Sequence, residues 1–441
     1  MTIKDYFKVS PRVLPVGKPA KITVEPRYEF LKFKGLHKVC IWPSYYFDAI
    51  APGEAYPAIE IEATDGKLLF EYDFGVEQEY FIQVTVAGPK GMQLQLETSV
   101  YAVKDDLLGR FPYKGDLHMH TTASDGLEDD RHRIAMARKA GFDFIALTDH
   151  NNYDASAQTI KLIQKLRLPI LVLRGEEVQA PGCHVHILSI DADYSIINDI
   201  NKDLKSFQAE VDKLEKNNTD TLLTGRNRLE SSIAQGVFAR IKKANGLSVF
   251  CHPFWKALQP QIGARLDIPL DIAEELFRKR NFDVFELVSG APICEANSNN
   301  LQTLFFAQHQ GYSNEIPLIG ISDAHTSNIE DASVFGINYT IAFCKELSPV
   351  GVREAIMNRY VVAVENAPIN SPRCYGDLRI VRFAQFAIEE YFRFHKEDAA
   401  AEGQLMLHMA AGDLSCLDTL HVVAKQNRAV LEAEWKSKKL D

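Results

Sequence analysis

Residues Asp116–His150 read DLHMHTTASDGLEDDRHRIAMARKAGFDFIALTDH and alternate between strand, helix and strand. The two ends are apolar enough for buried strands, and residues 129–140 between them have a helical pattern. Five more apolar segments follow, most of them separated by helical stretches: LPILVLRGEEV, HVHILSI, LSVFCHP, FDVFELVSG and PLIGISDAH. Apolar strands alternating with helices predict a parallel sheet covered on its faces, and this number of strands favours a β/α barrel.

The residues on either side of this alternation have other patterns. From Lys21 to about Val103, short β-rich segments such as KITVEPRYEF and YFIQVTVA are separated by turn signals such as PGE and TDG. Short strands at even spacing predict an Ig-like β-sandwich. From about Asp377 the sequence is rich in Ala, Leu, Glu and Lys, which predicts helices. We therefore expect a sandwich at residues 1–110, an α/β barrel at 111–375 and a helical appendage at 376–441.

A longer stretch is inserted within the predicted barrel, between Asn198 and Gly246. Its apolar residues recur at helical spacing, at Leu204, Phe207, Val211 and Leu214. We interpret this apolar face as packing surface, not as part of a substrate site.

The composition indicates a globular protein of more than one unit. The chain has 441 residues, 46% hydrophobic, and a net charge of −10. That charge disfavours long-range binding of nucleic acid, although it allows a small phosphorylated substrate in a metal-rich pocket. Because no segment has the apolar length of a signal peptide or membrane helix, we expect a cytoplasmic protein with no membrane partner. The seven cysteines form no CxxC pair, which favours free thiols.

Histidines gather at the ends of the predicted strands, where active sites of α/β barrels are built. Seven of the thirteen lie there: His118, His120, His150, His184, His186, His252 and His325. Residues two apart in a strand point the same way, so His118 and His120 can bind one ion together. The same spacing joins His184 with His186 and Asp323 with His325. Three such pairs predict a metal site.

Carboxylates complete the candidate ligand set. They are Asp125, Asp149, Glu176, Glu177, Glu286 and Asp323. Several would be costly to bury unless they were paired or bound to metal. Asp149 and His150 point to opposite faces of a strand, so His150 is the better ligand and Asp149 the better loop cap. Imidazole together with carboxylate suits zinc, manganese or iron.

This sequence resembles the PHP (polymerase and histidinol phosphatase) family of metallohydrolases. The motifs DLHMHT with SDG, FIALTDH, RGEEV followed by HVHILSI, GLSVFCHPF and GISDAH occur in that family's order, over Tyr113–His325. The β-rich unit before them also looks like the carbaryl-hydrolase-type branch. The resemblance implies a distorted seven-stranded β/α barrel.

The resemblance also implies two or three divalent ions and their ligands. The first ion would take His118, His120, Glu177 and Asp323. The second would share Glu177 and add His252 with His186, for which His184 is the competitor. The third would take Asp125, His150 and His325.

Such a cluster predicts a phosphoesterase that attacks a small phosphorylated substrate with metal-activated hydroxide. His184 is a candidate general acid, and Lys256 and Arg174 are candidates for binding phosphate. The first alternative is a metal-dependent carboxylic ester, carbamate or amide hydrolase, and the second is a non-catalytic metal-binding module. A nuclease would need a basic groove, which the negative net charge disfavours, and the oligomeric state is left open.

Overall fold

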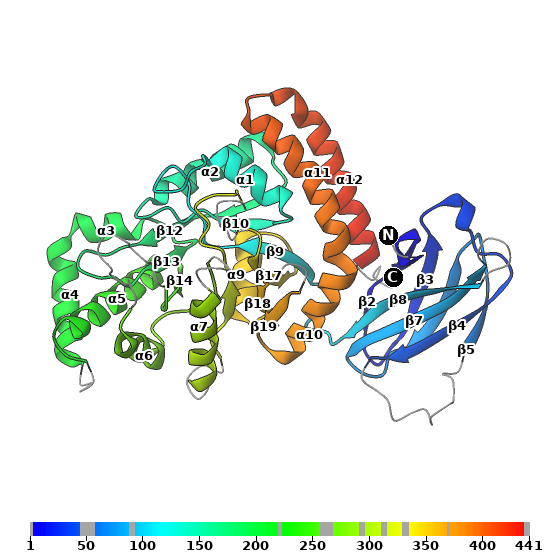
Figure 1. Cartoon of the computed structure of the whole chain (residues 1–441), viewed down its shortest axis with the longest axis horizontal. Helices are drawn as coiled ribbons and strands as arrows, with labels where there is room; N and C mark the ends of the chain where they lie inside the picture. Colours follow the sequence, from blue (N-terminus) through cyan, green and yellow to red (C-terminus); the bar gives the residue numbers. More distant parts are fainter. Residues whose placement is uncertain are drawn as a thin grey trace. The chain divides into compact units, whose positions relative to one another are not determined.

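The computed structural model describes residues 3–44, 58–87, 93–218, 223–255, 268–290, 296–309, 315–328, 335–367 and 371–435. It is a mixed α/β protein with helices at the C-terminal end of the chain (Figure 1). None of the helices in the described ranges is both long and apolar enough to cross a membrane. The six cysteines whose positions are described are free thiols, as expected.

By compactness the chain divides into two units. The first comprises Met1–Phe111, Arg382–His395 and Ala424–Asp441, and the second comprises Pro112–Val381 and Lys396–Val423. The C-terminal helices are therefore shared between the units. Boundaries at residues 110 and 375 between folding domains stay a prediction.

Two sheets make up the β-rich part of the first unit. Its strands are β1 (Phe7–Ser10), β2 (Val13–Pro15), β3 (Pro19–Pro26), β4 (Leu36–Pro43), β5 (Ala58–Glu62), β6 (Leu68–Asp73), β7 (Gln78–Ala87) and β8 (Gln93–Val103). One sheet has the order β1-β3-β6 and the other β2-β8-β7-β4-β5. Alternate residues such as Ile22 and Val24 enter a common apolar core. The short strands β1 and β2 precede Lys21, where the sequence analysis placed the first strand.

Helical segments from the C-terminal part of the chain complete the first unit. They are the end of α10 (Leu378–Ala387), the π-helical turn η5 (Ile388–Phe392), the start of α11 (Arg393–Ala410) and the end of α12 (Leu417–Trp435). Trp435 is 1% exposed, and its indole N–H donates to the backbone oxygen of Arg110 at 3.0 Å. The rings of Phe383 and Phe386 each lie 5.8 Å from the Trp435 ring, centre to centre.

We expect Trp435→Ala to lower the free energy of unfolding of the first unit by about 3–5 kcal/mol, because it leaves a large cavity among aromatic rings. Trp435→Phe keeps most of the packing and removes one buried hydrogen bond, which should cost about 1–2 kcal/mol. Denaturant unfolding followed by tryptophan and tyrosine fluorescence measures both. Equal losses for the two variants would contradict a packing role for this indole.

The second unit contains two further sheets and most of the helices. Its strands are β9 (Phe111–Asp116), β10 (Phe144–Ala146), β11 (Leu171–Leu173), β12 (Gly175–Val178), β13 (Ile187–Ile190), β14 (Leu247–Phe250), β15 (Val284–Val288), β16 (Leu318–Gly320), β17 (Asn338–Cys344), β18 (Val361–Glu365) and β19 (Arg373–Tyr375). Its helices are α1 (Asp130–Lys139), α2 (Tyr153–Leu166), α3 (Ile196–Lys202), α4 (Leu204–Asn217), α5 (Gly225–Lys243), α6 (Leu270–Lys279), α7 (Ala296–Gln308), α9 (Pro349–Met357) and part of α11 (Arg393–Ala410).

The sheets have the orders β11-β10-β9-β17-β18-β19 and β12-β13-β14-β15-β16. The pairs β9–β10, β10–β11, β14–β15 and β15–β16 are parallel, as the alternation of strands and helices predicts. The expectation of an all-parallel sheet is wrong at β13, which pairs antiparallel with both β12 and β14. The reason is local: only residues 179–186 connect β12 to β13, which is too short for the crossover helix that a parallel pair needs. β13 therefore runs antiparallel to β12, and also to β14, which runs in the direction of β12.

Two isolated parallel bridges join these sheets. One pairs Met119, after β9, with Ala324, after β16, and the other pairs His150, after β10, with Glu177 in β12. The inserted helices α4 and α5 lie side by side, and α5 packs against β13 and β14 (Figure 1). Phe207 and Val211 are buried, in agreement with the predicted apolar face of α4, whereas Leu204 at the first position of the helix is 49% exposed.

Candidate metal centre

The metal-ligand candidates lie where strands of the second unit end. The chain leaves β9 toward His118 and His120, β10 toward His150, and β14 toward His252. Asp323 and His325 follow β16 in the same way. Because β9–β10, β14–β15 and β15–β16 are parallel pairs, the carboxyl ends of the strands share an edge within each sheet, and the Met119–Ala324 bridge joins the two edges.

The reversed strand β13 brings one more histidine to this edge. His186 precedes β13, and the antiparallel pairing with β12 and β14 places the start of β13 beside their ends. His184 and His186 lie before β13 and outside regular strand, so the alternation expected for this pair does not apply. Their side chains point in different directions, because His186 contacts Glu177 and His184 contacts Glu230.

Glu177 is the central carboxylate of the site. It is 1% exposed and projects from β12 among imidazoles. Its oxygens lie 2.8 Å from His186 Nδ1, 3.1 Å from His118 Nε2, 3.1 Å from His150 Nδ1, 3.2 Å from His120 Nε2 and 3.2 Å from His252 Nε2. One carboxylate thus contacts five histidines that come from four different parts of the chain.

Donor atoms converge in overlapping groups, each with all its donors within 4.8 Å of one another. The groups are His118 with His120, Glu177 and Asp323; Glu177 with His186 and His252; and His120 with Asp125, His150 and His325. A fourth group joins His118 with Cys251 and His252. The structure therefore brings together all nine residues that the resemblance implied as ligands, and their assignment to individual ions stays a proposal.

The TTASDG loop holds the third of these groups in place. Asp149 is buried and accepts hydrogen bonds from the backbone nitrogen of Thr121 at 2.7 Å and from the Ser124 hydroxyl at 2.8 Å. It acts as a loop cap, the role expected for it. Gly126 is required because a Cβ there would lie 2.6 Å from the carbonyl of His120.

The site attracts positive charge. Burial alone would raise the pKa of Glu177, but the surrounding imidazoles, His118 foremost, hold that pKa well below its usual value. Burial would lower the pKa of His120, yet the Asp323 and Glu177 carboxylates raise it to about 9. Burial is also outweighed at His252, where Glu177 and other carboxylates raise the pKa to about 9. Carboxylates that favour protons on imidazoles also favour a divalent cation in place of those protons.

The donor chemistry fits divalent transition metals. The Nε2 atoms of His118 and His120 are 3.2 Å apart and face the same two carboxylates, Glu177 and Asp323. A shared cation would bind both nitrogens and both carboxylates at once. On the far side of its ring, His118 Nδ1 lies 3.8 Å from the carboxylate of Glu286, which is fully buried and accepts no hydrogen bond that meets the usual geometry among the described residues. Such an outer carboxylate orients a metal-binding histidine.

Two residues of the site have backbone angles that side chains seldom adopt. The φ angle is +25° at His252 and +54° at Asp323. The backbone nitrogen of Asp323 donates to the His118 oxygen at 3.0 Å, which fixes this conformation. Strain of this kind is typical of functional sites.

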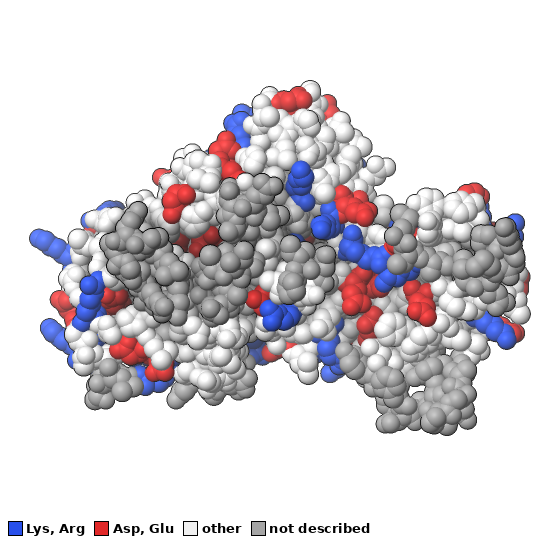
Figure 2. Space-filling model, viewed as in Figure 1, with Lys and Arg blue, Asp and Glu red and all other residues white. Residues whose placement is uncertain are grey.

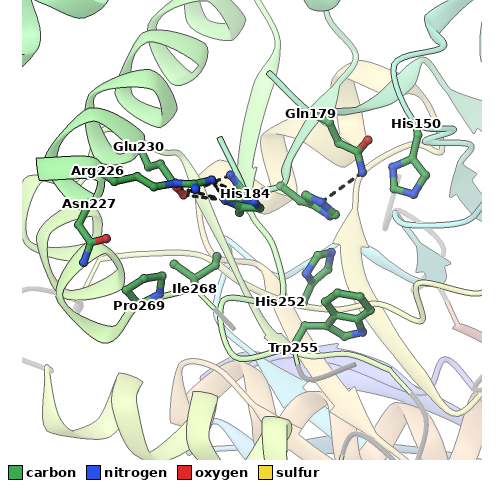
Figure 3. Close-up of a pocket in the computed structure, with 11 residues that line it drawn as sticks. His150, Gln179, His184, Arg226, Asn227, Glu230, His252, Trp255, Ile268 and Pro269 are labelled. Carbon is green, nitrogen blue, oxygen red and sulfur yellow. Dashed lines mark hydrogen bonds and ion pairs between the residues drawn. The ribbon is translucent and has the colours of Figure 1, made fainter. Parts of the chain in front are cut away.

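A pocket of about 530 Å³ opens beside the cluster (Figure 3). His150, His186 and His252 lie at its cluster side, and it is also lined by Gln179, His184, Arg226, Asn227, Glu230, Trp255, Ile268 and Pro269. Figure 3 shows Arg226, Asn227 and Glu230 on the side of the pocket away from His150 and His252. The volume suits a small organic molecule.

The three candidates for catalysis and phosphate binding have different surroundings. His184 lines the pocket, where its Nδ1 lies 3.1 Å from Glu230. Arg174 donates to Asp191 at 2.9 Å and belongs neither to the pocket lining nor to a donor group among the described residues. Lys256 lies outside the described residues. Catalytic roles for these three stay predictions.

The inserted stretch also contributes to the pocket, which the sequence analysis did not predict. The first turns of α5 place Arg226 and Glu230 in the pocket, although α4 packs as expected. The sequence signal was present but not specific, because an Arg and a Glu four residues apart occur on many exposed helices. Gln179 and Trp255 also line the pocket, and their positions depend on the fold alone.

The PHP domain family matches residues 116–339, just over half of the chain, and the chain belongs to this family. A curated relative, DNA polymerase/3'-5' exonuclease PolX of Bacillus subtilis (strain 168), is 23% identical over 282 residues, which cover 60% of this chain and 44% of the relative. The chain thus spans less than half the length of that relative.

Solved structures give weaker likenesses. One is a two-domain protein from Bacteroides vulgatus ATCC 8482, described as containing a predicted PHP-like metal-dependent phosphoesterase, with 22% identity, 58% of this chain and 65% of that chain covered, and a TM-score of 0.37. Another is an amidohydrolase from Chromobacterium violaceum with bound sulfate, with 18% identity, 50% and 89% coverage, and a TM-score of 0.32. TM-scores this low support no transfer of function.

Family membership and the convergent donor groups together support a metal-dependent hydrolase. Divalent metal binding follows from the same two observations.

Proposed function

We propose that this protein is a phosphoesterase that cleaves small phosphorylated molecules. The observation that carries the proposal is the overlap of the donor groups, in which Glu177, His118, His120 and His252 each belong to two groups. Shared donors favour two or three ions held close together, whereas a carbonyl hydrolase needs fewer. We further propose zinc, manganese or iron as the ions.

Closely spaced divalent cations would supply an acidified water and offset the charge on a phosphoryl group. The chain's own residues would position these cations and the substrate. Glu177 and Asp323 orient the imidazoles, and Glu286 backs His118 from the buried side. His150, His186 and His252 face both the cluster and the pocket, so a substrate in the pocket meets the cluster with one end. His184, which lines the pocket, is the proposed proton donor to the leaving group.

We also propose that seven strands, β9, β10 and β12–β16, form a distorted barrel around the site. Support comes from the two isolated bridges, because Met119–Ala324 and His150–Glu177 link the β12–β16 sheet at each edge to an extension of β9 or β10. Glu177 is thus held between two neighbouring strands.

Phosphodiester cleavage in DNA is a second candidate, favoured by the similarity to the PolX DNA polymerase/3'-5' exonuclease. Two observations favour a small substrate over a polymer. The net charge is −10, and on the face shown in Figure 2 acidic and basic side chains lie among one another over the described residues.

We expect the metal-loaded protein to release phosphate from 4-nitrophenyl phosphate, and a chelator to lower the rate by roughly 10³-fold or more because the acidified water is lost. Zinc or manganese added back should restore the rate. Phosphate release is measured beside hydrolysis of 4-nitrophenyl acetate, an aryl carbamate and a single-stranded DNA oligonucleotide.

If only the acetate or carbamate is cleaved, the carbonyl hydrolase replaces this proposal. Cleavage of the oligonucleotide alone would support the nuclease. A metal-loaded protein inert toward every substrate would favour a non-catalytic metal-binding module.

A further inference from the structure

At the end of the pocket away from the metal cluster, a buried carboxylate holds the guanidinium of Arg226 in place. The carboxylate of Glu230, on α5, is buried and accepts a hydrogen bond from Arg226 Nε at 2.6 Å. His184 Nδ1 lies 3.1 Å from the same carboxylate. The backbone nitrogen of His184 also donates to Glu230 at 3.3 Å. The carboxylate therefore fixes a guanidinium and an imidazole against each other (Figure 3).

The fixed guanidinium keeps free donors toward the pocket. The side chain of Arg226 is 67% exposed, whereas that of Glu230 is 5% exposed. Glu230 occupies the Nε atom, Nη2 lies 3.1 Å from His184 Nδ1, and Nη1 has no partner among the described residues. A planar guanidinium held in one orientation is well suited to a carboxylate or phosphate.

The nearby carboxylates do not occupy these free donors. Glu230 is engaged by Arg226 and His184 from the buried side. Asp271 accepts from the amide of Asn227 at 2.9 Å and is not part of the pocket lining. Asn227, Ile268 and Pro269 also line this end, so no carboxylate other than Glu230 lines it among the described residues.

We propose that Arg226, positioned by Glu230, binds a second anionic group of the substrate while the scissile phosphate lies at the metal cluster. The substrate class is then an organic phosphate that also carries a carboxylate or a second phosphate, joined by a body small enough for about 530 Å³. This inference rests on the proposed phosphoesterase function.

The test compares four aryl phosphates: phenyl phosphate, 4-carbamoylphenyl phosphate, 4-carboxyphenyl phosphate and 1,4-phenylene bisphosphate. The carbamoyl substrate matches the carboxyl substrate in shape without its charge. Because the substituents also change the leaving group, each substrate is compared between the wild-type protein and Arg226→Met. We expect the loss of kcat/KM to be about 10- to 100-fold larger for the carboxyl substrate, the bisphosphate or both than for the two uncharged-tail substrates.

Two further variants separate binding from a structural effect. Lys242→Met removes one positive charge from the exposed far end of α5 and should change no substrate by more than about twofold. Glu230→Gln keeps the shape but weakens the positioning of Arg226, so kcat/KM should fall more for the doubly anionic substrates than for the two uncharged-tail substrates. An effect through His184, which Glu230 also holds, would lower kcat on all four substrates alike.

An equal loss on all four substrates would mean that Arg226 acts on the scissile phosphate, and no loss on any would mean that it is a solvent-exposed charge; either result overturns the inference.

Calorimetric titration with phenylphosphonate and 4-carboxyphenylphosphonate measures binding without turnover. We expect the carboxyl compound to bind about tenfold or more tightly to the wild-type protein than to Arg226→Met, whereas equal affinities would overturn the inference. Failure of the proposed function is a separate result, namely a wild-type protein that cleaves none of the phosphates.

Discussion

Glu177→Gln should lower kcat/KM for an aryl phosphate by roughly 10³-fold or more and reduce the bound metal by at least one ion per chain. The carboxylate lies within 3.2 Å of nitrogen atoms from five histidines and belongs to two donor groups. Glutamine has the same shape, so the packing around β12 is preserved. The amide, however, carries no charge to attract cations and presents one donor nitrogen to a site of cations and imidazoles. Elemental analysis of the purified protein and steady-state kinetics measure the two effects.

The neighbouring residue provides a matched control. Glu176 is as buried as Glu177 but points to the opposite side of β12, where Ser195 donates to it at 2.9 Å. Burial raises the pKa of Glu176 to about 7, so a neutral glutamine resembles a form that this carboxyl group readily adopts. Glu176→Gln should therefore keep its metal content. If Glu176→Gln lost metal as completely as Glu177→Gln, the assignment of Glu177 as the bridging carboxylate would be wrong.

The second large effect is expected at Asp323. Asp323→Asn should lower kcat/KM by about 10²-fold or more, because the negative charge facing His118 and His120 is lost. Asparagine tolerates the φ angle of +54°, so the backbone conformation should be kept. The midpoint of thermal unfolding without added metal should nevertheless fall, because His118 and His120 lose an ion-pair partner. Asp323→Ala should lose activity equally and cost about 1–2 kcal/mol of stability in addition, because alanine disfavours that backbone angle. Kinetics, metal content and thermal unfolding are measured on both variants.

A smaller effect is expected at Asp125, the most exposed carboxylate of the cluster. The side chain of Asp125 is 52% exposed, and it contacts His150 and His325 at 3.4 Å and 3.3 Å. Asp125→Asn should weaken the outermost group of donors while leaving the ions near Glu177 bound. An Asp125→Asn variant that loses more metal than Asp323→Asn would contradict the expectation that the ions near Glu177 stay bound.

The sequence by itself determined which residues could form the cluster. His118 with His120, and Asp323 with His325, follow apolar strands at a two-residue spacing, and this pattern is local. It also determined the role of Asp149 as a loop cap and the limits of helix α1, which begins after its N-cap Asp129 within the expected residues 129–140. The motif order indicated the PHP family, which the match over residues 116–339 confirms. These features depend on residues close together in the chain, so local patterns contain them.

The tertiary structure decided the rest, because it depends on how distant segments pair. Which histidine of the HVH segment faces Glu177 depends on the pairing of β13 with β12 and β14, and a short apolar segment does not show which strands it will pair with. The pocket needed the same information. In the sequence, Arg226 and Glu230 look like an ordinary ion pair on a surface helix. Only the packing of α5 against β13 and β14 shows that they lie beside His184 in the pocket. Strand pairing and helix docking are set by burial of apolar faces over the whole second unit, and no single stretch of sequence determines them.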